Sequence, residues 1–524
     1  MKFNNKFLYG VLFIVVVLLL FGCSSESNSD SGSDGGESAD ELRVALNAQP
    51  PTLDPLISTA TVTRDIALQI FEPLVTINAN LQPEPMLAES YETSDDGKLI
   101  TFHLREGIKF HNGKEMTAED VVASMQRWQE YSSRAKAAFS EGVFKAKDKY
   151  TVLLELQKPN RTAFSVLSST TQLPAIMPKE VIESAGEDGI DEYIGTGPFK
   201  FDEWKQDQHI KLTKFKEYQA SSAPSDGPAG KREALIEELY FMIVTDSSTR
   251  LAGMKSGEYD LATTIPFDSY DQIESDSNIK PYTGPSGFNL IVFNKKEGAF
   301  SDVKVRQAVA AALDLEEILI ASLSSEKFYR MNPGLMMKEQ SDWYTQAGSE
   351  YYNQKDPEKA KRLLQEAGYD GEPVTFITSR EYEDFYTASV VVKEQLEEIG
   401  MNINLEVYDW ATVIESQGDS TAYDAFITGF GINTDPTQLI FLDSKNGWAG
   451  WTDSPKIDRL LDEIRGASSK EEAKAKNEEL QLAAWEYLPV LKIGDKNFLY
   501  AVSKDVKGFK DIIGMNFWNV EKTN

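Results

Sequence analysis

Alternating apolar and polar positions predict strands near the start of the folded body. Residues 42–46 alternate as one strand, and residues 98–104 follow an Asp-Gly turn, as the return strand of a hairpin would. Residues 117–120, Thr-Ala-Glu-Asp, form a capping box that predicts a helix continuing to Trp128. This part of the chain is therefore expected to be α+β.

Farther along, the apolar pattern changes to helices that lead into strands. Asp356-Pro357 starts a helix whose apolar residues keep the i, i+3, i+4, i+7 spacing, and Gly368 ends it. A second helix ends at Gly400 and leads directly into the alternating strand 403–407. Because the two parts differ in architecture, the chain is expected to form two lobes of an α/β protein.

The N-terminus carries an apolar segment, residues 7–22, directly before Cys23, which is the single cysteine of 524 residues. The segment is shorter than the about 20 apolar residues that cross a bilayer, which is typical of a secretory signal peptide. Because the small residue Gly22 precedes the cysteine, the segment resembles a bacterial lipoprotein signal. This implies that residues 1–22 are removed and Cys23 is lipidated. The alternative is an uncleaved membrane anchor with an incidental cysteine.

Residues 23–41 are predicted to be a disordered tether. They consist almost wholly of Ser, Asp, Glu, Gly and Asn, which cannot bury enough apolar surface to become ordered. The body is therefore expected to lie outside the cytoplasm, lipid-anchored to the cell membrane.

Composition and motifs argue against several function classes. The formal net charge of −30 excludes a nucleic-acid partner. His103, His111 and His209 are the only histidines and none is spaced for a metal site. No nucleophile elbow, dinucleotide fingerprint or phosphate loop is found. We expect no metal, no cofactor and no enzymatic activity, although an unmarked pair of catalytic carboxylates stays open.

Short segments along most of the mature chain carry a family resemblance. They are 53–55 (Leu-Asp-Pro), 102–107 (Phe-His-Leu-Arg-Glu-Gly), 110–113 (Phe-His-Asn-Gly), 117–121 (Thr-Ala-Glu-Asp-Val), 195–199 (Gly-Thr-Gly-Pro-Phe), 303–308 (Val-Lys-Val-Arg-Gln-Ala), 356–360 (Asp-Pro-Glu-Lys-Ala) and 434–436 (Thr-Asp-Pro). In this order they resemble the family 5 extracellular solute-binding proteins, the oligopeptide, dipeptide and nickel receptors of ABC importers. The segments themselves have structural interpretations, such as turns, and we interpret Arg306 as serving a surface or interlobe ion pair.

The resemblance implies a two-lobed, type II periplasmic-binding-protein-like fold with an extra peripheral subdomain and a hinge that the chain crosses twice. The crossings are expected near residues 283–288 and 493–497. The implied boundaries are lobe I at 42–283, with the peripheral subdomain at about 58–190, lobe II at 284–493, and a return to lobe I at 494–524.

The resemblance also implies two ligand-binding charges. Asp435 matches the carboxylate that meets a peptide's α-amino group in the family's dipeptide receptor, and Arg380 matches the arginine that meets the α-carboxylate. For Asp435 the alternative is an Asx turn before Pro436, and for Arg380 it is a surface charge at a helix start. The residues after Arg380 depart from the dipeptide receptor's pattern, which leaves the ligand's length open.

Four aromatic residues near these charges are candidates for side-chain pockets: Tyr382, Tyr386, Trp410 and Phe430. The alternative for each is a place in the core. The expected function is capture of di- or oligopeptides by a monomeric receptor that delivers them to an ABC permease and ATPase complex. A receptor for nickel, a metal chelate or another small solute is the alternative within the family. A surface adhesin or chaperone lipoprotein is the alternative from a different class.

Overall fold

The computed structural model describes residues 40–186 and 189–523, which belong to one compact unit. The predicted signal peptide, Cys23 and the tether up to residue 39 lie outside the described residues. Glu41, which we assigned to the tether, is instead the first residue of a strand. For orientation we keep the names lobe I for residues 42–283 with 494–524, and lobe II for residues 284–493.

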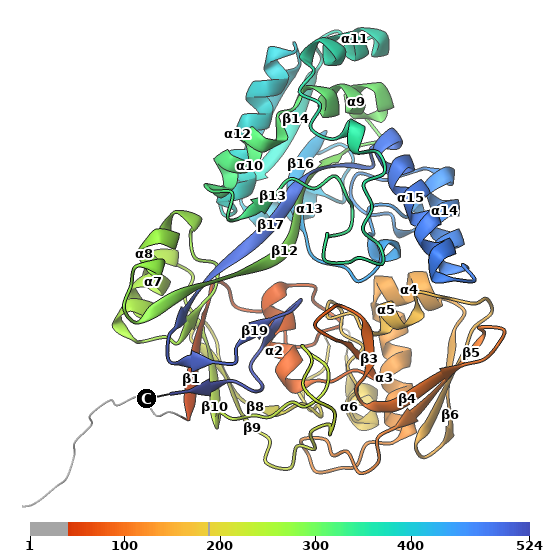
Figure 1. The fold of residues 1–524 in the computed structure, drawn as a ribbon, viewed down its shortest axis with the longest axis vertical. Coiled ribbons are helices and arrows are strands. Elements are labelled where there is room, and N and C mark those ends of the chain that lie inside the picture. Colours follow the sequence, from red (N-terminus) through yellow and green to blue (C-terminus); the bar gives the residue numbers. More distant parts are fainter. Residues whose placement is uncertain (1–39, 187–188, 524) are drawn as a thin grey trace, which may run out of the picture. The chain divides into compact units, whose positions relative to one another are not determined.

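One 11-stranded sheet extends through both lobes (Figure 1). In spatial order it contains β15 (Asn402–Tyr408), β14 (Pro373–Ser379), β16 (Ala425–Phe430), β12 (Ile279–Phe293), β17 (Val490–Ser503), β11 (Leu261–Ala262), β1 (Glu41–Leu46), β10 (Glu238–Ile243), β9 (His209–Lys214) and β8 (Phe199–Lys205), with β13 (Tyr329–Arg330) beside β17. Strand β1, predicted from the alternation at 42–46, is confirmed and pairs in parallel with β10 and β11.

The long strands β12 and β17 join the two halves of this sheet. They pair antiparallel from Ile279 opposite Ser503 to Val292 opposite Val490. Figure 1 shows the pair running from the part of the sheet beside β1 to the part beside β16. The segments expected to cross between the lobes lie on these two strands, opposite each other.

A separate four-stranded sheet lies in lobe I, with the order β4 (Ala88–Thr93), β5 (Leu99–Leu104), β7 (Thr151–Glu155) and β6 (Val143–Asp148). The predicted hairpin is confirmed, since β4 and β5 pair antiparallel. The predicted helix is also confirmed as α3 (Ala118–Tyr131), where the backbone N–H of Thr117 donates to Asp120 Oδ2 at 2.9 Å. Apolar residues of this sheet and helix form their own core cluster.

The remaining helices of lobe I are α2 (Thr61–Ile70), α4 (Ser133–Phe139), α5 (Ala163–Leu167), α6 (Lys179–Ser184), α7 (Ser247–Ser256) and α8 (Tyr270–Glu274). Three pairs of short strands complete this lobe: β2 (Val75–Ile77) with β3 (Pro83–Pro85), β18 (Val506–Lys507) with β21 (Glu521–Lys522), and β19 (Lys510–Asp511) with β20 (Met515–Asn516). The C-terminal strands thus pack within lobe I, where Met515 and Phe517 join its core cluster.

In lobe II, helices cover the sheet formed by β14, β15 and β16. They are α9 (Val303–Ala312), α10 (Leu315–Leu323), α11 (Pro357–Ala367), α12 (Glu383–Glu398), α13 (Trp410–Ser416), α14 (Pro455–Arg465) and α15 (Lys470–Tyr487). Three predicted elements are confirmed as α11, α12 and β15. The Asp356 side chain caps α11 by accepting from the Lys359 N–H, and Gly368 ends it with φ of 75°.

The interpretation of Arg306 as a surface or interlobe ion pair is wrong. Its side chain is 1% exposed and donates to the backbone carbonyl oxygens of Tyr487, Leu488, Phe300 and Ser301. The guanidinium therefore joins α9 to the end of α15 within lobe II.

Candidate functional site

The C-terminal ends of three parallel strands bring most of the predicted site residues to one edge of the lobe II sheet. β14 is parallel to both β15 and β16. Arg380 directly follows β14, Trp410 follows β15 after one residue, and Phe430 is the last residue of β16. Ligands of open α/β sheets bind at this edge because loops from neighbouring strands diverge there.

The aromatic side chains at this edge form a cluster. The ring centroid of Tyr382 lies 4.5 Å from that of Trp410 and 5.2 Å from that of Phe385. Tyr382 is 39% exposed, whereas Phe385 is buried at 5%. The cluster therefore has one buried face and presents the Tyr382 ring at the surface.

Arg380 and Tyr386 form a pair of their own. The Arg380 guanidinium lies 4.7 Å from the centroid of the Tyr386 ring, and its Nη2 donates to the Tyr386 hydroxyl at 3.1 Å. Arg380 is exposed. It is therefore held in place by an aromatic face and remains accessible at the C-terminal end of β14.

Phe430 packs against the core of lobe II and is not part of the cluster of Tyr382, Phe385 and Trp410. Its ring centroid is 5.0 Å from that of Phe441, 5.9 Å from that of Phe288 and 6.0 Å from that of Trp448. Phe430 is partly buried, so one side of its ring belongs to the core of lobe II. This is the core placement that the sequence left open as an alternative.

Asp435 is fully buried at the start of a short 3-10 helix, Pro436–Gln438. Its Oδ1 accepts from the Thr437 N–H at 2.8 Å and the Thr437 hydroxyl at 2.5 Å, and its Oδ2 accepts from Gln438 Nε2 at 2.7 Å. Burial raises the pKa of this carboxyl, and the hydrogen bonds from Thr437 and Gln438 act against that shift. The Asx-type cap considered from the sequence is present, and Oδ2 retains acceptor capacity beyond the Gln438 bond.

A cation that the sequence did not mark faces Asp435 from lobe I. Nη1 of Arg134, on α4, donates to the Ser169 hydroxyl at 2.8 Å and to Gln438 Oε1 at 3.3 Å. Arg134 keeps part of its surface exposed, yet burial of its charged end lowers its pKa to about 10. The negative charge of Asp435 acts against that shift and raises the pKa of Arg134. The two opposite charges are therefore close enough to attract each other.

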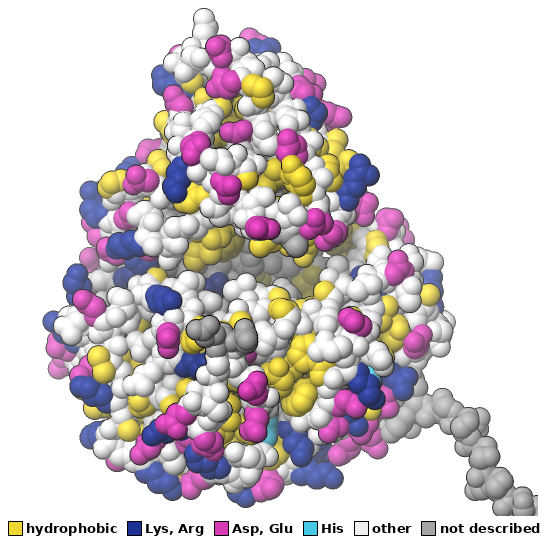
Figure 2. Space-filling model, turned by 180° about the vertical axis from the view of Figure 1, so that it is seen from behind, with side chains coloured by type: hydrophobic (Ala, Val, Ile, Leu, Met, Phe, Trp, Pro, Cys, Tyr) yellow, Lys and Arg dark blue, Asp and Glu magenta, His cyan; other side chains and the backbone are white. Residues whose placement is uncertain are grey.

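Arg134 lines a small cavity between the lobes, and Asp435 follows the lining residue Thr434 in the chain. Its lining combines lobe I and lobe II residues: Ile77, Arg134, Ser168, Ser169, Thr170, Thr171 and Ile513 with Ile432, Thr434 and Gln438. Hydroxyl groups dominate the polar part of this lining. Figure 2 shows the surface hollowed along the line where the two lobes meet.

Hydrogen bonds hold the lobes together beside this cavity. The Thr434 hydroxyl donates to the Ser165 carbonyl at 3.1 Å, and the hydroxyls of Thr162 and Thr437 lie 3.3 Å apart. The Arg161 N–H donates to the Arg465 carbonyl at 2.8 Å. The described arrangement is therefore closed, with free space for about one water molecule in the interlobe cavity.

A second ion pair lies between the aromatic cluster and the strands that join the lobes. Lys496 Nζ, from β17, donates to Asp384 Oδ2 at 2.6 Å, and Asn289 Nδ2, from β12, lies 3.3 Å from the same oxygen. Lys496 Nζ also lies 5.3 Å from the centroid of the Phe385 ring. The start of α12 is thus tied to both β12 and β17.

Within the residues that the structure describes, no group of three or more His, Cys, Asp or Glu side chains is arranged to hold a metal ion. No helix among residues 40–186 and 189–523 is long and apolar enough to span a membrane.

Comparison with known proteins adds family information to this geometry. The model of the bacterial extracellular solute-binding proteins, family 5 (middle), matches residues 82–451. A "probable peptide ABC transporter periplasmic-binding protein" of Sinorhizobium fredii is 28% identical over 92% of this chain and 93% of the relative. The oligopeptide-binding protein AppA of Bacillus subtilis is 26% identical over 97% of this chain and 96% of its own length.

A solved structure shares the fold. The binding protein AgaA of A. tumefaciens, in complex with agropinic acid, has a TM-score of 0.80 and 27% identity, covering 92% of this chain and 99% of AgaA. This likeness confirms the predicted α/β, type II binding-protein fold.

Proposed function

We propose that this chain, which belongs to the bacterial extracellular solute-binding proteins of family 5, captures short peptides and delivers them to the permease and ATPase of an ABC importer. The peptide and oligopeptide relatives support this assignment. In this role the protein binds and releases its ligand and carries out no reaction itself.

The observation that carries the proposal is the pair of opposite charges at the interlobe cavity. A free peptide has an ammonium group and a carboxylate, and burying either without a partner costs several kcal/mol. Asp435 supplies a buried carboxylate from lobe II, and Arg134 supplies a partly desolvated cation from lobe I. Each lobe would then hold one end of the ligand, so the ligand favours closure of the lobes around it, in an arrangement whose cavity is wider than that of the described one.

Arg380 is the second candidate for the carboxylate. It is exposed at the C-terminal edge of the lobe II sheet, and its guanidinium is oriented by Tyr386. Tyr382 and Trp410 lie at the same edge of the sheet, with their ring centroids 4.5 Å apart. Aromatic faces at such a place accept varied side chains. A longer peptide reaching this edge would use Arg380, and a shorter one would use Arg134.

Ligand entry requires the lobes to separate, because the closed cavity has room for about one water molecule. We place the hinge on β12 and β17, where the pairing has an irregularity between Pro285 and Gly287. Rotation there would break the interlobe hydrogen bonds of Thr434 and Arg161 without unfolding either lobe. The proposed boundaries are those expected from the sequence, with the peripheral sheet inside lobe I.

The proposal includes attachment to the membrane. Lipidated Cys23 and a flexible tether would hold a monomeric body outside the cytoplasm, within reach of the permease. Globomycin-sensitive processing, or a lipid mass on the N-terminal peptide, would establish this attachment independently of ligand binding.

Native mass spectrometry of the purified protein tests the function, followed by thermal unfolding with a mixed library of di- to pentapeptides. We expect a bound mass that fragments into amino acids, and a rise in melting temperature with peptide, because a ligand that binds only the folded state stabilises it. A protein that neither retains nor is stabilised by any peptide would overturn the proposal.

A further inference from the structure

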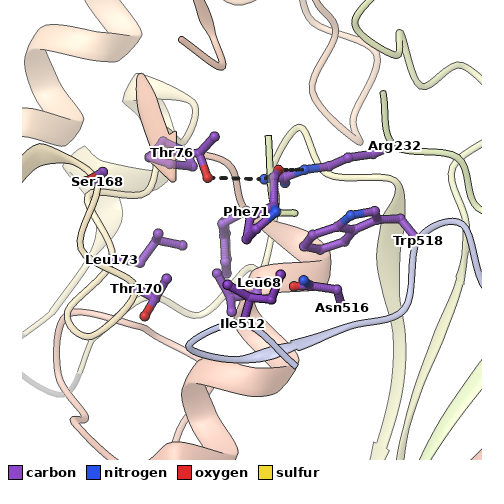
Figure 3. A pocket seen from close by; sticks show the side chains of 12 residues that line it. Leu68, Phe71, Thr76, Ser168, Thr170, Leu173, Arg232, Ile512, Asn516 and Trp518 are labelled. Carbon is purple, nitrogen blue, oxygen red and sulfur yellow. Dashed lines mark hydrogen bonds between the residues drawn. The ribbon is translucent and has the colours of Figure 1, made fainter. Parts of the chain in front are cut away.

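A second cavity lies inside lobe I (Figure 3). Its wall is largely apolar, formed by Leu68, Phe71, Pro73, Leu173, Pro228, Ile512 and Trp518. The polar groups in the wall are Thr76, Ser168, Thr170, Arg232 and Asn516. Ser168 and Thr170 line both cavities, so the two cavities are neighbours.

The carboxamide of Asn516 is the unusual group in this wall. Asn516 is 3% exposed, and among the described residues neither its Oδ1 nor its Nδ2 has a hydrogen-bond partner. The Thr170 hydroxyl is likewise buried without a partner in the described part of the chain. Buried polar atoms are nearly always paired, so a donor and an acceptor left together in one cavity indicate a ligand or a bound water.

The backbone around Asn516 is fixed. Gln69 Nε2 donates to the Met515 carbonyl at 2.8 Å, and the Phe517 N–H donates to Gln69 Oε1 at 3.2 Å. In Figure 3 the amide of Asn516 is directed toward Leu68 and Ile512, in the space bordered by the Trp518 ring. The carboxamide is therefore presented from a rigid support rather than from a mobile loop.

The cavity has no net charge to offer a ligand. Arg232, 2% exposed, lies 4.1 Å from the centroid of the Trp518 ring and donates to the Pro228 carbonyl. Its charge is balanced by the buried carboxylate of Glu72, 3.4 Å from Nη1. A charged ligand group would thus be buried here without a counter-charge, which is strongly unfavourable.

We propose that this cavity is a subsite of the binding cleft that accepts an uncharged side-chain carboxamide of the bound peptide. The inference rests on the proposed peptide-binding function and names the class of peptide, those containing glutamine or asparagine. A carboxamide carries an acceptor and a donor side by side, which match Nδ2 and Oδ1 of Asn516 in a two-bond pair. Its methylene stem would lie against the apolar wall.

A strained turn borders both cavities. Ile512 lines the inner cavity, Ile513 lines the interlobe one, and Ile513 has φ of 50°, a conformation that a β-branched residue rarely adopts. Strain of this kind persists only where the surroundings impose it, and it is common at ligand-binding positions. We expect the turn to shift when the peptide side chain enters, which widens the inner cavity beyond the space for about one water.

Calorimetry with tripeptides of alanine tests the subsite. Gln, Met or Glu replaces the alanine at each position in turn, because Met matches the length of Gln and Glu matches its shape. We expect one position at which Gln binds roughly tenfold or more tighter than Met and Glu, since a polar site rejects analogues that leave its groups unpaired. N516L should abolish that preference, so that the Gln and Met peptides bind within about twofold of each other. T170V, which keeps the side-chain shape, should reduce the preference and serves if N516L does not fold.

The outcomes separate the two proposals. No binding of any tripeptide overturns this inference, and the proposed function falls with it only if the peptide library also gives no bound mass and no rise in melting temperature. Tight binding without a Gln preference at any position, or a Gln preference that survives in N516L, overturns the inference alone. A crystal structure of the Gln-peptide complex with only a water at Asn516 would also reject it.

Discussion

His111 and Gly197 are joined by a hydrogen bond of 3.0 Å between the ring Nε2 and the carbonyl oxygen. The Gly195 N–H donates to the other ring nitrogen, Nδ1, at 3.2 Å, so Nε2 carries the proton of a neutral ring. The His111 N–H also donates to the Gly195 carbonyl at 2.9 Å. Two of the family's sequence segments, 110–113 and 195–199, are thus one structural unit.

This unit predicts a specific acid sensitivity. Burial lowers the pKa of His111 from 6.5 to about 4. Because the folded-state pKa lies below the unfolded value, the stabilisation is present above about pH 6.5 and is lost as the pH falls toward 4. We expect urea unfolding to show wild type losing about 3 kcal/mol relative to H111Q across this range. Parallel pH profiles of the two proteins would contradict the assignment.

Replacing Asp435 separates its charge from its cap. D435A removes both, whereas D435N keeps an acceptor for the Thr437 N–H and removes the charge together with the hydrogen bond from Gln438 Nε2. If Asp435 meets the ligand's ammonium, both variants should weaken peptide binding by 3 to 5 kcal/mol, which is about a hundredfold or more. D435A should lower the melting temperature of the ligand-free protein more than D435N does, because only D435A removes the cap. Unchanged peptide affinity in both would leave Asp435 as a turn residue.

Peptides with and without a C-terminal carboxylate can show whether Arg134 or Arg380 binds that carboxylate. Wild type should bind a C-terminally amidated peptide more weakly than the free acid, and calorimetry measures the difference. In R134Q that difference should disappear, with the free acid losing roughly tenfold to a hundredfold in affinity, because a charge-assisted hydrogen bond is lost. K136Q changes an exposed cation on the same helix and serves as the control. If R380Q erases the difference instead, Arg380 is the carboxylate partner.

The sequence predicted a helix correctly where the residues that start and end it lie within the helix or beside it. Helix α11 was foreseen because Asp356, Pro357 and Gly368 act within the helix itself. Arg306 was misread because its acceptors at Tyr487 and Leu488 come from a helix end about 180 residues away in sequence. A basic residue in a polar stretch carries no trace of such a partner.

The site was predicted only in part for the same reason. Arg380 could be marked because the residues around it match a position of the family's dipeptide receptor, and Trp410 and Phe430 could be marked as aromatic residues near the two candidate charges. Arg134 could not, since its role depends on Gln438, which is 304 residues away. Asn516 was also missed, because its importance lies in the partners that it lacks among the described residues.

Gly287 lies at the irregular part of the proposed hinge, and its replacement is expected to be costly. It has φ of 119°, and a Cβ atom there would lie 2.0 Å from the Phe430 carbonyl oxygen. G287A should therefore destabilise the protein by about 2 kcal/mol or more, because it adds both backbone strain and a backbone clash.

Gly431 provides the matched control for this variant. A Cβ atom at Gly431 would meet nothing within 4 Å, and its φ is not in the left-handed region. G431A should therefore leave the urea unfolding midpoint close to that of wild type, while G287A shifts it down. If G287A unfolds like wild type, β12 and Phe430 can move apart at no cost, and the hinge must be looser at this point than the closed arrangement requires.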